Sequence, residues 1–184
     1  MTDRTPAPFR ADLGDGAVLR RYTVEDVDEL WALVQAERER IGVWMPWVAS
    51  TTTIEAQRAW LERVTVAEGL DGCGIWAGDR YAGGAGLSWD PFGIAGEIGY
   101  WIGSEFEGRG LVTRACRALI EHGFGVVGLH RISIRAGVEN ARSRAIPERL
   151  GFTREGVLRG EGRGSGGFYD LIVYGLLEEE WSRA

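Results

Sequence analysis

The chain of 184 residues contains no lysine, so all 21 of its basic residues are arginines. It has only two cysteines, Cys73 and Cys116, and only two histidines, His122 and His130. Two distant cysteines are too few for a zinc site or a disulfide framework, and neither histidine has the spacing of a metal-binding motif. We therefore expect no bound metal, and two cysteines that are free thiols in the core.

Long apolar runs are also missing from the sequence. No stretch approaches the roughly 20 apolar residues that a helix needs to cross a bilayer, and the polar residues 1–16 hold no apolar signal segment. We expect a cytoplasmic protein with one domain over residues 1–184 and no membrane partner. Its first 16 residues are predicted to be flexible.

Acidic residues outnumber basic ones, 27 to 21, which gives a net charge of −6. Residues 1–103 hold 9 arginines and 16 acids, whereas residues 104–165 hold 11 arginines and 7 acids. An acidic chain argues against nonspecific binding of nucleic acid. The basic middle suits a polyanionic cofactor, and the acidic flanks suit an amine substrate. The alternative is an unevenly charged surface without a ligand.

The segment of residues 96–124 holds the most informative pattern. An extended apolar stretch, Ile98–Ile102, leads into Gly108 and Gly110, and an amphipathic helix follows. The first N–H groups of a helix lack partners within the helix, and the helix dipole adds positive potential, so a glycine turn placed there can bind phosphate. One Gly-x-Gly is weak evidence in a chain with 28 glycines. The helix presents these residues to the core: Leu111, Ala115, Cys116, Leu119 and Ile120.

Periodicity and turn residues predict the other elements. Strands are expected over residues 17–22, 72–77, 81–89, 94–102, 130–136, 152–158 and 168–177. Helices are expected after Thr23, after Thr51 and over residues 141–150, the last with Asn140 as its N-cap. Two of these helices are predicted to pack inward through Val27, Leu30, Trp31 and Val34, and through Ala56, Trp60, Val64 and Ala67. The glycine-dense residues 159–167 are predicted to be a mobile loop. This order indicates an α+β, or mixed α/β, fold.

The short apolar segment of residues 41–48 contains Trp44 and Trp47. It forms either a hydrophobic plug over the core or one wall of an acceptor site. The sequence leaves both interpretations open.

Four features together resemble the GNAT-superfamily acyl-CoA N-acyltransferases, and within them the RimJ/RimL-type (ribosomal-protein N-alpha-acetyltransferase-like) enzymes. They cover nearly the whole chain, in the family's order and spacing. They are the strand Glu97-Ile-Gly-Tyr-Trp-Ile102, the pyrophosphate loop Glu107-Gly-Arg-Gly-Leu-Val112, Asn140-Ala-Arg-Ser143 followed by Leu150-Gly-Phe152, and Thr153-Arg-Glu-Gly156 with Tyr169-Asp170.

The resemblance implies the GNAT fold: a twisted, mostly antiparallel seven-stranded sheet, splayed between its fourth and fifth strands, with helices on both faces. Acetyl-CoA (coenzyme A) would bind in that opening, with its diphosphate on the N–H groups of residues 107–112 and with Arg109 or Arg114 adding charge. The implied cofactor-binding residues are Tyr100, Trp101, Ile102, Glu107, Gly108, Arg109, Gly110, Leu111, Val112, Asn140 and Ser143.

The sequence departs from the family's pyrophosphate motif at two positions. Glu107 stands where the family has glutamine or arginine, and Val112 stands where it has glycine or alanine. Because the phosphate cradle is mainly backbone, the Glu107 side chain can turn to solvent and need not abolish binding. Its charge would still repel a diphosphate, so we expect Glu107→Gln to tighten acetyl-CoA binding.

For the chemistry, the resemblance implies that Ser143 is the general acid that protonates the leaving sulfur. The alternative is that Ser143 only satisfies the helix N-terminus. Pro147 cannot donate to the carbonyl of residue 143, so the helix is expected to kink or open there. Glu97 is the first candidate for the general base, and its alternative role is a surface charge. Asp90 and Glu161 are weaker candidates.

For the acceptor, Trp44, Trp47 and Trp89 are expected on one side of the entrance and Tyr169 with Asp170 on the other. The glycine-dense loop would act as a lid.

The sequence therefore predicts an acetyl-CoA-dependent N-acetyltransferase that acts by direct transfer in a ternary complex. The expected partner is an amine, above all a protein N-terminal α-amine, and a homodimer stays open. One alternative is a non-catalytic acyl-CoA-binding or regulatory module. Another is a transferase for small amines such as polyamines or aminosugars. A nucleotide-binding enzyme is disfavoured, because no Lys-Ser/Thr pair follows the glycines.

Overall fold

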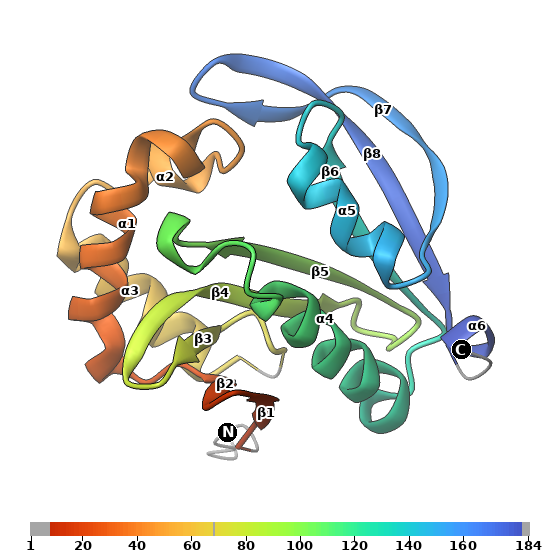
Figure 1. The fold of residues 1–184 in the computed structure, drawn as a ribbon, viewed down its shortest axis with the longest axis horizontal. Coiled ribbons are helices and arrows are strands. Elements are labelled where there is room, and N and C mark those ends of the chain that lie inside the picture. The colour runs from red at the N-terminus through yellow and green to blue at the C-terminus, as the bar shows by residue number, and fades with distance from the viewer. Residues whose placement is uncertain (1–7, 68, 182–184) are drawn as a thin grey trace.

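The computed structural model describes residues 8–67 and 69–181. Eight strands form one mixed sheet in the order β1-β2-β3-β4-β5-β6-β8-β7 (Figure 1). Neighbouring strands are antiparallel, except β5 and β6, which are parallel. The strands are β1 Arg10–Gly14, β2 Ala17–Arg21, β3 Cys73–Ala77, β4 Arg80–Trp89, β5 Ala95–Ile102, β6 Arg131–Gly137, β7 Thr153–Gly164 and β8 Gly167–Leu177.

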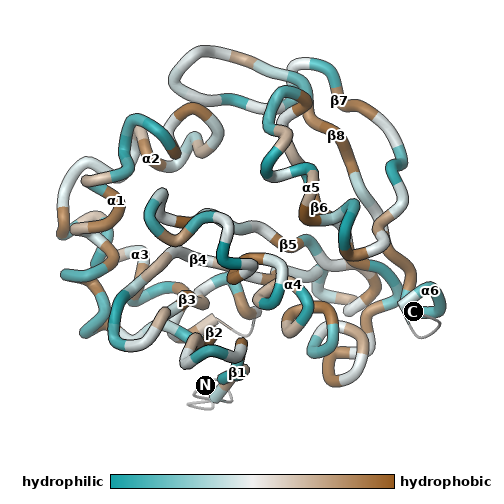
Figure 2. Tube along the Cα trace, viewed as in Figure 1, coloured by the Kyte–Doolittle hydropathy of each residue, from teal (hydrophilic) through white to brown (hydrophobic). Residues whose placement is uncertain are grey.

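Helices cover both faces of this sheet. They are α1 Val27–Gly42, α2 Trp47–Ser50, α3 Ile54–Thr65, α4 Leu111–His122, α5 Ala141–Arg149 and α6 Glu178–Trp181. Two hydrophobic clusters follow from this arrangement, one that includes the buried side of α4 and one that includes α1 and α3. Hydrophobic and hydrophilic segments alternate along α4, as the sequence predicts for an amphipathic helix (Figure 2). No helix among the described residues is long and apolar enough to cross a membrane.

The sheet splits between β5 and β6, as predicted. The two strands pair only from Ala95 with Arg131 to Ile98 with Ile134. Beyond Ile98, β5 continues against β4 alone, up to Ile102, and β6 continues against β8. Residues 99–102 therefore have no strand partner on the β6 side, which is the requirement for a ligand to enter between the two halves.

The N-terminal segment differs from the prediction. Residues 10–14 are not flexible but form β1, which pairs with β2, so the sheet has eight strands where seven were expected. A tight turn makes this hairpin, with positive φ at Gly14, Asp15 and Gly16. The expectation for residues 1–7 lies outside the described residues.

The prediction of a mobile loop over residues 159–167 is wrong. Strand β7 runs on to Gly164 and β8 begins at Gly167. The tip of this hairpin lies against the end of α1, where the Ser165 N–H donates to the Gly42 carbonyl at 2.9 Å. A Cβ at Gly164 would collide with the Val43 carbonyl oxygen. The glycine here permits close backbone packing.

The inward faces of the helices are partly as predicted. Val27, Leu30 and Val34 of α1 are buried. In α3 the buried residues are Gln57 and Leu61, and the prediction of Ala56 at the core was wrong, because Ala56 is exposed. Helix α3 ends at Thr65, before Ala67. Both cysteines are free and buried, as predicted.

Candidate active site

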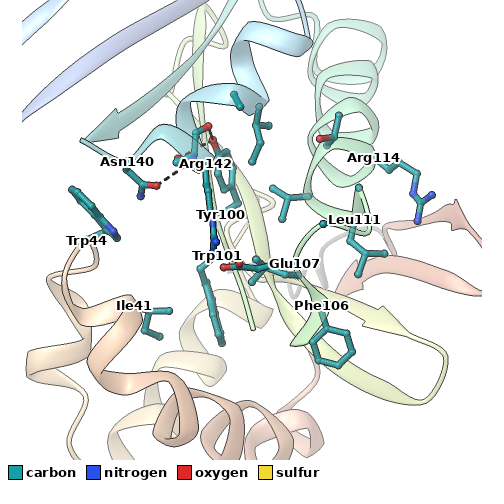
Figure 3. Close-up of a pocket in the computed structure, with 18 of the residues that line it drawn as sticks. Ile41, Trp44, Tyr100, Trp101, Phe106, Glu107, Leu111, Arg114, Asn140 and Arg142 are labelled. Carbon is teal, nitrogen blue, oxygen red and sulfur yellow. Dashed lines mark hydrogen bonds and ion pairs between the residues drawn. The ribbon is translucent and has the colours of Figure 1, made fainter. Parts of the chain in front are cut away.

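A cleft of about 930 Å³ opens where β5 and β6 separate (Figure 3). It is bordered by the end of β5, the glycine turn, the first turn of α4 and the first turns of α5. All but one of the residues predicted to bind the cofactor line it: Tyr100, Trp101, Ile102, Glu107, Gly108, Gly110, Leu111, Val112, Asn140 and Ser143.

The glycine turn at the start of α4 is shaped to receive an anion. Gly108 and Gly110 have φ values of 73° and 70°, in the left-handed region that favours glycine, and Gly110 is the residue that precedes the helix. The N–H groups of the first turn of α4 have no partners within the helix. Four arginines also line the cleft: Arg40, Arg114, Arg142 and Arg149. Backbone donors, the helix dipole and these guanidinium groups suit a diphosphate.

The Glu107 side chain is held by two arginines instead of turning freely to solvent. One oxygen of its carboxylate pairs with Arg40 of α1 at 2.9 Å and the other pairs with Arg142 of α5, and its side chain is only 25% exposed. Glu107 therefore joins two helices at the cleft, and the two arginines offset the repulsion of its charge toward an anion.

The two arginines proposed to assist the diphosphate differ in position. Arg114 lines the cleft and pairs with Asp15 at 3.1 Å. Arg109 does not line it, because its guanidinium lies over the Phe106 ring, 5.7 Å from the ring centroid. Arg40 and Arg142 line the cleft, as was expected of Arg109.

The start of α5 brings three candidate residues together. The Asn140 side-chain oxygen accepts from the Ser143 N–H at 3.2 Å, which confirms Asn140 as the N-cap. The Tyr100 hydroxyl donates to the Ser143 carbonyl at 2.9 Å and lies 3.1 Å from Ser143 Oγ. Burial raises the pKa of Tyr100, so this phenol stays protonated.

Pro147 explains the contact between Tyr100 and the Ser143 carbonyl. In an unbroken helix that carbonyl would accept from the N–H of residue 147, which proline lacks. Helix α5 nevertheless runs without interruption from Ala141 to Arg149, so the expected opening at Pro147 does not occur. The freed carbonyl instead accepts from Tyr100. Since a hydroxyl has one proton, the Tyr100 oxygen is then left to accept from Ser143 Oγ.

A second pocket, of about 420 Å³, lies on the other face of the β4–β5 ladder. Met45, Tyr100 and Trp101 line both this pocket and the cofactor cleft. Trp47 and Glu97, which were predicted for the acceptor and the base, also line it. The Glu97 carboxylate accepts from one edge of the Arg135 guanidinium, with Oε1 2.9 Å from Nε and Oε2 2.8 Å from Nη2.

The remaining predicted acceptor residues lie elsewhere. Trp44 lines the cofactor cleft, where its ring meets the edge of Tyr169 at a centroid distance of 5.1 Å. Tyr169, Trp89 and Asp170 line neither pocket. Asp170 accepts from the Gly160 N–H at 2.7 Å, within the β7–β8 hairpin. Asp90, a weaker candidate for the base, accepts from the N–H groups of its own turn, which lowers its pKa.

This arrangement agrees with the comparison to known proteins. Residues 17–153 match the family described as an acetyltransferase (GNAT) domain. The chain belongs to the GNAT acetyltransferases. A Bacillus subtilis relative, named "Putative ribosomal N-acetyltransferase YdaF", is 34% identical over 178 residues, which are 94% of this chain and 97% of that protein.

Solved structures show the same GNAT fold. A structure called "Probable acetyltransferase" is 32% identical, with a TM-score of 0.85 over 94% of this chain and 99% of the other. A microcin C7 self-immunity acetyltransferase, solved with acetyl-CoA and AMP, is 28% identical, with a TM-score of 0.80 over 90% and 94% of the two chains. A RimL ribosomal L7/L12 α-N-protein acetyltransferase in complex with coenzyme A is 22% identical. Its TM-score of 0.86, over 94% and 99%, shows the shared fold.

This GNAT chain is therefore an N-acetyltransferase, and its acetyl donor is acetyl-CoA. The residues of the cleft themselves fit that donor, since the glycine turn and four arginines line it and suit an elongated polyanion. Sequence reasoning missed Arg40, Arg142, Gln57 and Asp71 as lining residues. Only the arginine-rich composition of the chain indicates Arg40 and Arg142, and no local motif marks Gln57 or Asp71 as part of a site.

Proposed function

We propose that this acetyltransferase moves the acetyl group to a protein N-terminal α-amine, directly, within a ternary complex. One observation carries the proposal: two pockets on opposite faces of the β4–β5 ladder share Met45, Tyr100 and Trp101. Donor and acceptor can therefore reach the same point of β5 from the two sides.

Direct transfer is favoured over an acyl-enzyme intermediate. Cys73 is the one cysteine that lines either pocket among the described residues. Burial raises the pKa of its thiol to about 12, so almost none is present as the nucleophilic thiolate at neutral pH.

In the reaction, the acetyl carbon–sulfur bond breaks, a carbon–nitrogen bond forms, the amine loses one proton and the sulfur gains one. Ser143 is the proposed acid: its Oγ proton, which the Tyr100 oxygen accepts in the free site, would turn to the leaving sulfur. Glu97, which lines the second pocket and is paired with Arg135, is the proposed base and would take the amine proton through water. Backbone N–H groups of β5 beyond Ile98, which have no partner strand on the β6 side, are the proposed donors to the thioester oxygen.

The names of the relatives support a protein acceptor. The full-length Bacillus subtilis relative is named as a ribosomal N-acetyltransferase. An Escherichia coli ribosomal-protein-serine acetyltransferase is 36% identical over 38% of this chain. A small amine is the second candidate, because an Escherichia coli spermidine N(1)-acetyltransferase is 37% identical over 33% of this chain.

The test is a transfer assay with purified protein and acetyl-CoA. The assay compares, by release of free thiol, peptides with free N-termini, the same peptides with blocked N-termini, polyamines and aminosugars. Mass spectrometry then locates the acetyl group. We expect acetylation of free N-termini alone. Faster transfer to polyamines or aminosugars would favour the second candidate, and tight acetyl-CoA binding without any transfer would favour a non-catalytic module. A cytoplasmic location and a homodimer stay predictions, for fractionation and sedimentation to test.

A further inference from the structure

Arg40 of α1 is held at three points beside the cofactor cleft. Its Nε donates to Glu37, one Nη donates to the carbonyl of Ile102 at the end of β5, and the other Nη pairs with Glu107 at 2.9 Å. Glu37 is itself fixed, because it is only 8% exposed and accepts from the Ser104 N–H at 2.8 Å. The protein therefore orients this guanidinium toward the glycine turn.

Of the three partners of Arg40, Glu107 is the one that a ligand can replace. The Ile102 carbonyl belongs to the backbone of β5, and Glu37 is buried. The Glu107 side chain is 25% exposed, and its second oxygen pairs with Arg142 of α5. A phosphate group placed between the two arginines would find the same two donors. The diphosphate of acetyl-CoA can therefore take the place of Glu107 while Arg40 keeps its other two contacts.

Helix α1 also leads from the cofactor cleft to the second pocket. Met45, which follows the helix, lines both, and Trp47 at the start of α2 lines the second. Arg38 of α1 donates to the Val48 carbonyl at 2.6 Å and to the Thr51 carbonyl, so α2 is fastened to α1. Thr51 lines the second pocket as well. A group that fixes the end of α1 therefore also fixes one wall of that pocket.

We propose that Arg40 couples the two pockets. When the diphosphate replaces Glu107, Arg40 ties the end of α1 to the bound cofactor, and α1 transmits this restraint to the wall formed by Met45, Trp47 and Thr51. The acceptor then binds more tightly to the protein with cofactor than to the free protein. Arg40 is a positioning residue for the acceptor. The inference rests on the proposed function, because it assumes that the second pocket receives the amine.

The first test uses the wild-type protein and calorimetry. The dissociation constant of a peptide with a free N-terminus is measured alone, with saturating coenzyme A, and with saturating pantetheine, which lacks the diphosphate. Neither compound carries an acetyl group, so no transfer interferes. We expect coenzyme A to tighten peptide binding at least about fivefold, the lower end of typical coupling between sites, and pantetheine to change it by less than about twofold. Because coupling is reciprocal, the peptide should tighten coenzyme A binding by the same factor.

The second test compares two arginine variants. Arg40→Met removes the guanidinium and keeps a long apolar stem, so the gain in peptide affinity with coenzyme A should fall below about twofold. Arg142→Met is the matched control, since Arg142 pairs with the same carboxylate from α5 and does not line the second pocket. Both variants should weaken coenzyme A binding, but Arg142→Met should keep the gain of at least about fivefold. Melting temperatures show whether both variants fold.

Equal tightening by coenzyme A and pantetheine would overturn the inference, and so would full coupling in Arg40→Met. The wild-type comparison decides even where Arg40→Met does not fold. The proposed function fails in a different measurement, the transfer assay: if a small amine is acetylated in place of N-termini, the same binding measurements with that amine still test Arg40. An acceptor that binds equally to the free protein and to its complex with coenzyme A would contradict the coupling and leave the proposed function standing.

Discussion

The two pockets differ in how the protein builds them. The cofactor cleft takes most of its lining from two nearly continuous stretches, residues 100–114 and 140–149. The second pocket, which we propose for the acceptor, takes about half of its lining from β4 and β5 and the rest from α1, α2, α3, β3 and the loops between them. The first can be assembled by backbone N–H groups and glycines in one local motif, whereas the second depends on side chains that only the completed fold brings together.

The two pockets also differ in charge. Four arginines and a single acid, Glu107, line the cofactor cleft. Among the described residues, the acceptor pocket has two carboxylates and no arginine in its lining. A surface for a polyanion and a surface for an amine therefore meet at β5, and their opposite charges keep each reactant from competing for the other's place. The following changes, made on one side at a time, test how far the two surfaces act separately.

The largest effect is expected for Ser143→Ala, on the cofactor side. If Ser143 is the general acid, kcat should fall about 10²–10⁴-fold, while the dissociation constant for acetyl-CoA changes little. Stopped-flow thiol release and calorimetry measure the two quantities. Ser165→Ala is the control, because Ser165 is exposed and its contact to α1 uses the backbone N–H. Activity retained within about threefold in Ser143→Ala would show that Ser143 only satisfies the helix N-terminus.

Gly99→Val tests the acceptor side alone. The added side chain would occupy the second pocket, which Gly99 lines and where no atom lies within 4 Å of the Cβ, and valine suits a strand. We expect kcat/KM for acceptor peptides to fall about 10–200-fold, the range for steric discrimination in a pocket, with unchanged affinity for acetyl-CoA. Gly156→Val, in the edge strand β7 and with equally open surroundings, is the control. An equal loss of acetyl-CoA affinity would mean that the two surfaces are not separate.

The contrast between a cleft built from local segments and a pocket built from distant ones also explains what could be predicted from the sequence. The glycine turn and the Asn140 cap follow from local patterns, whereas the splayed sheet follows from the family resemblance, and all three are present in the structure. The acceptor side was predicted from conspicuous aromatic residues, and Trp89 and Tyr169 line neither pocket. Position on a strand face and packing between distant helices decide which side chains form a pocket, and composition does not reveal them.

Glycine content is a second feature from which the sequence alone did not predict the structure. In residues 159–167 it suggested a mobile lid, but β7 continues through that segment and its tip packs against α1. Glycine allows both flexibility and close approach of backbones, and the sequence alone does not distinguish the two. The pairing of Glu107 with Arg40 was missed for a related reason, because 67 residues separate them.

Pro147→Ala tests how finely the acid is positioned. Alanine restores an N–H that can donate to the Ser143 carbonyl and so compete with the Tyr100 hydroxyl. Since a hydrogen bond contributes about 0.5–1.5 kcal/mol net, kcat should fall about two- to tenfold. The melting temperature should rise, because proline is unfavourable inside a helix. Pro91→Ala, in the exposed turn after β4, is the control. Raised stability with undiminished kcat would remove Pro147 from the positioning of Ser143.

Glu107→Gln has the smallest expected effect and tests the charge of the cofactor side. In the wild type, a bound diphosphate must share Arg40 and Arg142 with the Glu107 carboxylate. Removing that charge frees both guanidinium groups for the ligand. Because partly exposed ion pairs contribute only about 0–1 kcal/mol, the dissociation constant for acetyl-CoA should decrease by no more than about fivefold. The gain should shrink as salt is added, since salt screens exposed charges. Glu105→Gln removes a carboxylate two residues away that pairs with Arg80 and does not line the cleft, so it controls for net charge. Weaker acetyl-CoA binding in Glu107→Gln than in that control would show that the bridge between α1 and α5 holds the cleft in shape, and that Glu107 assists the cofactor rather than competing with it.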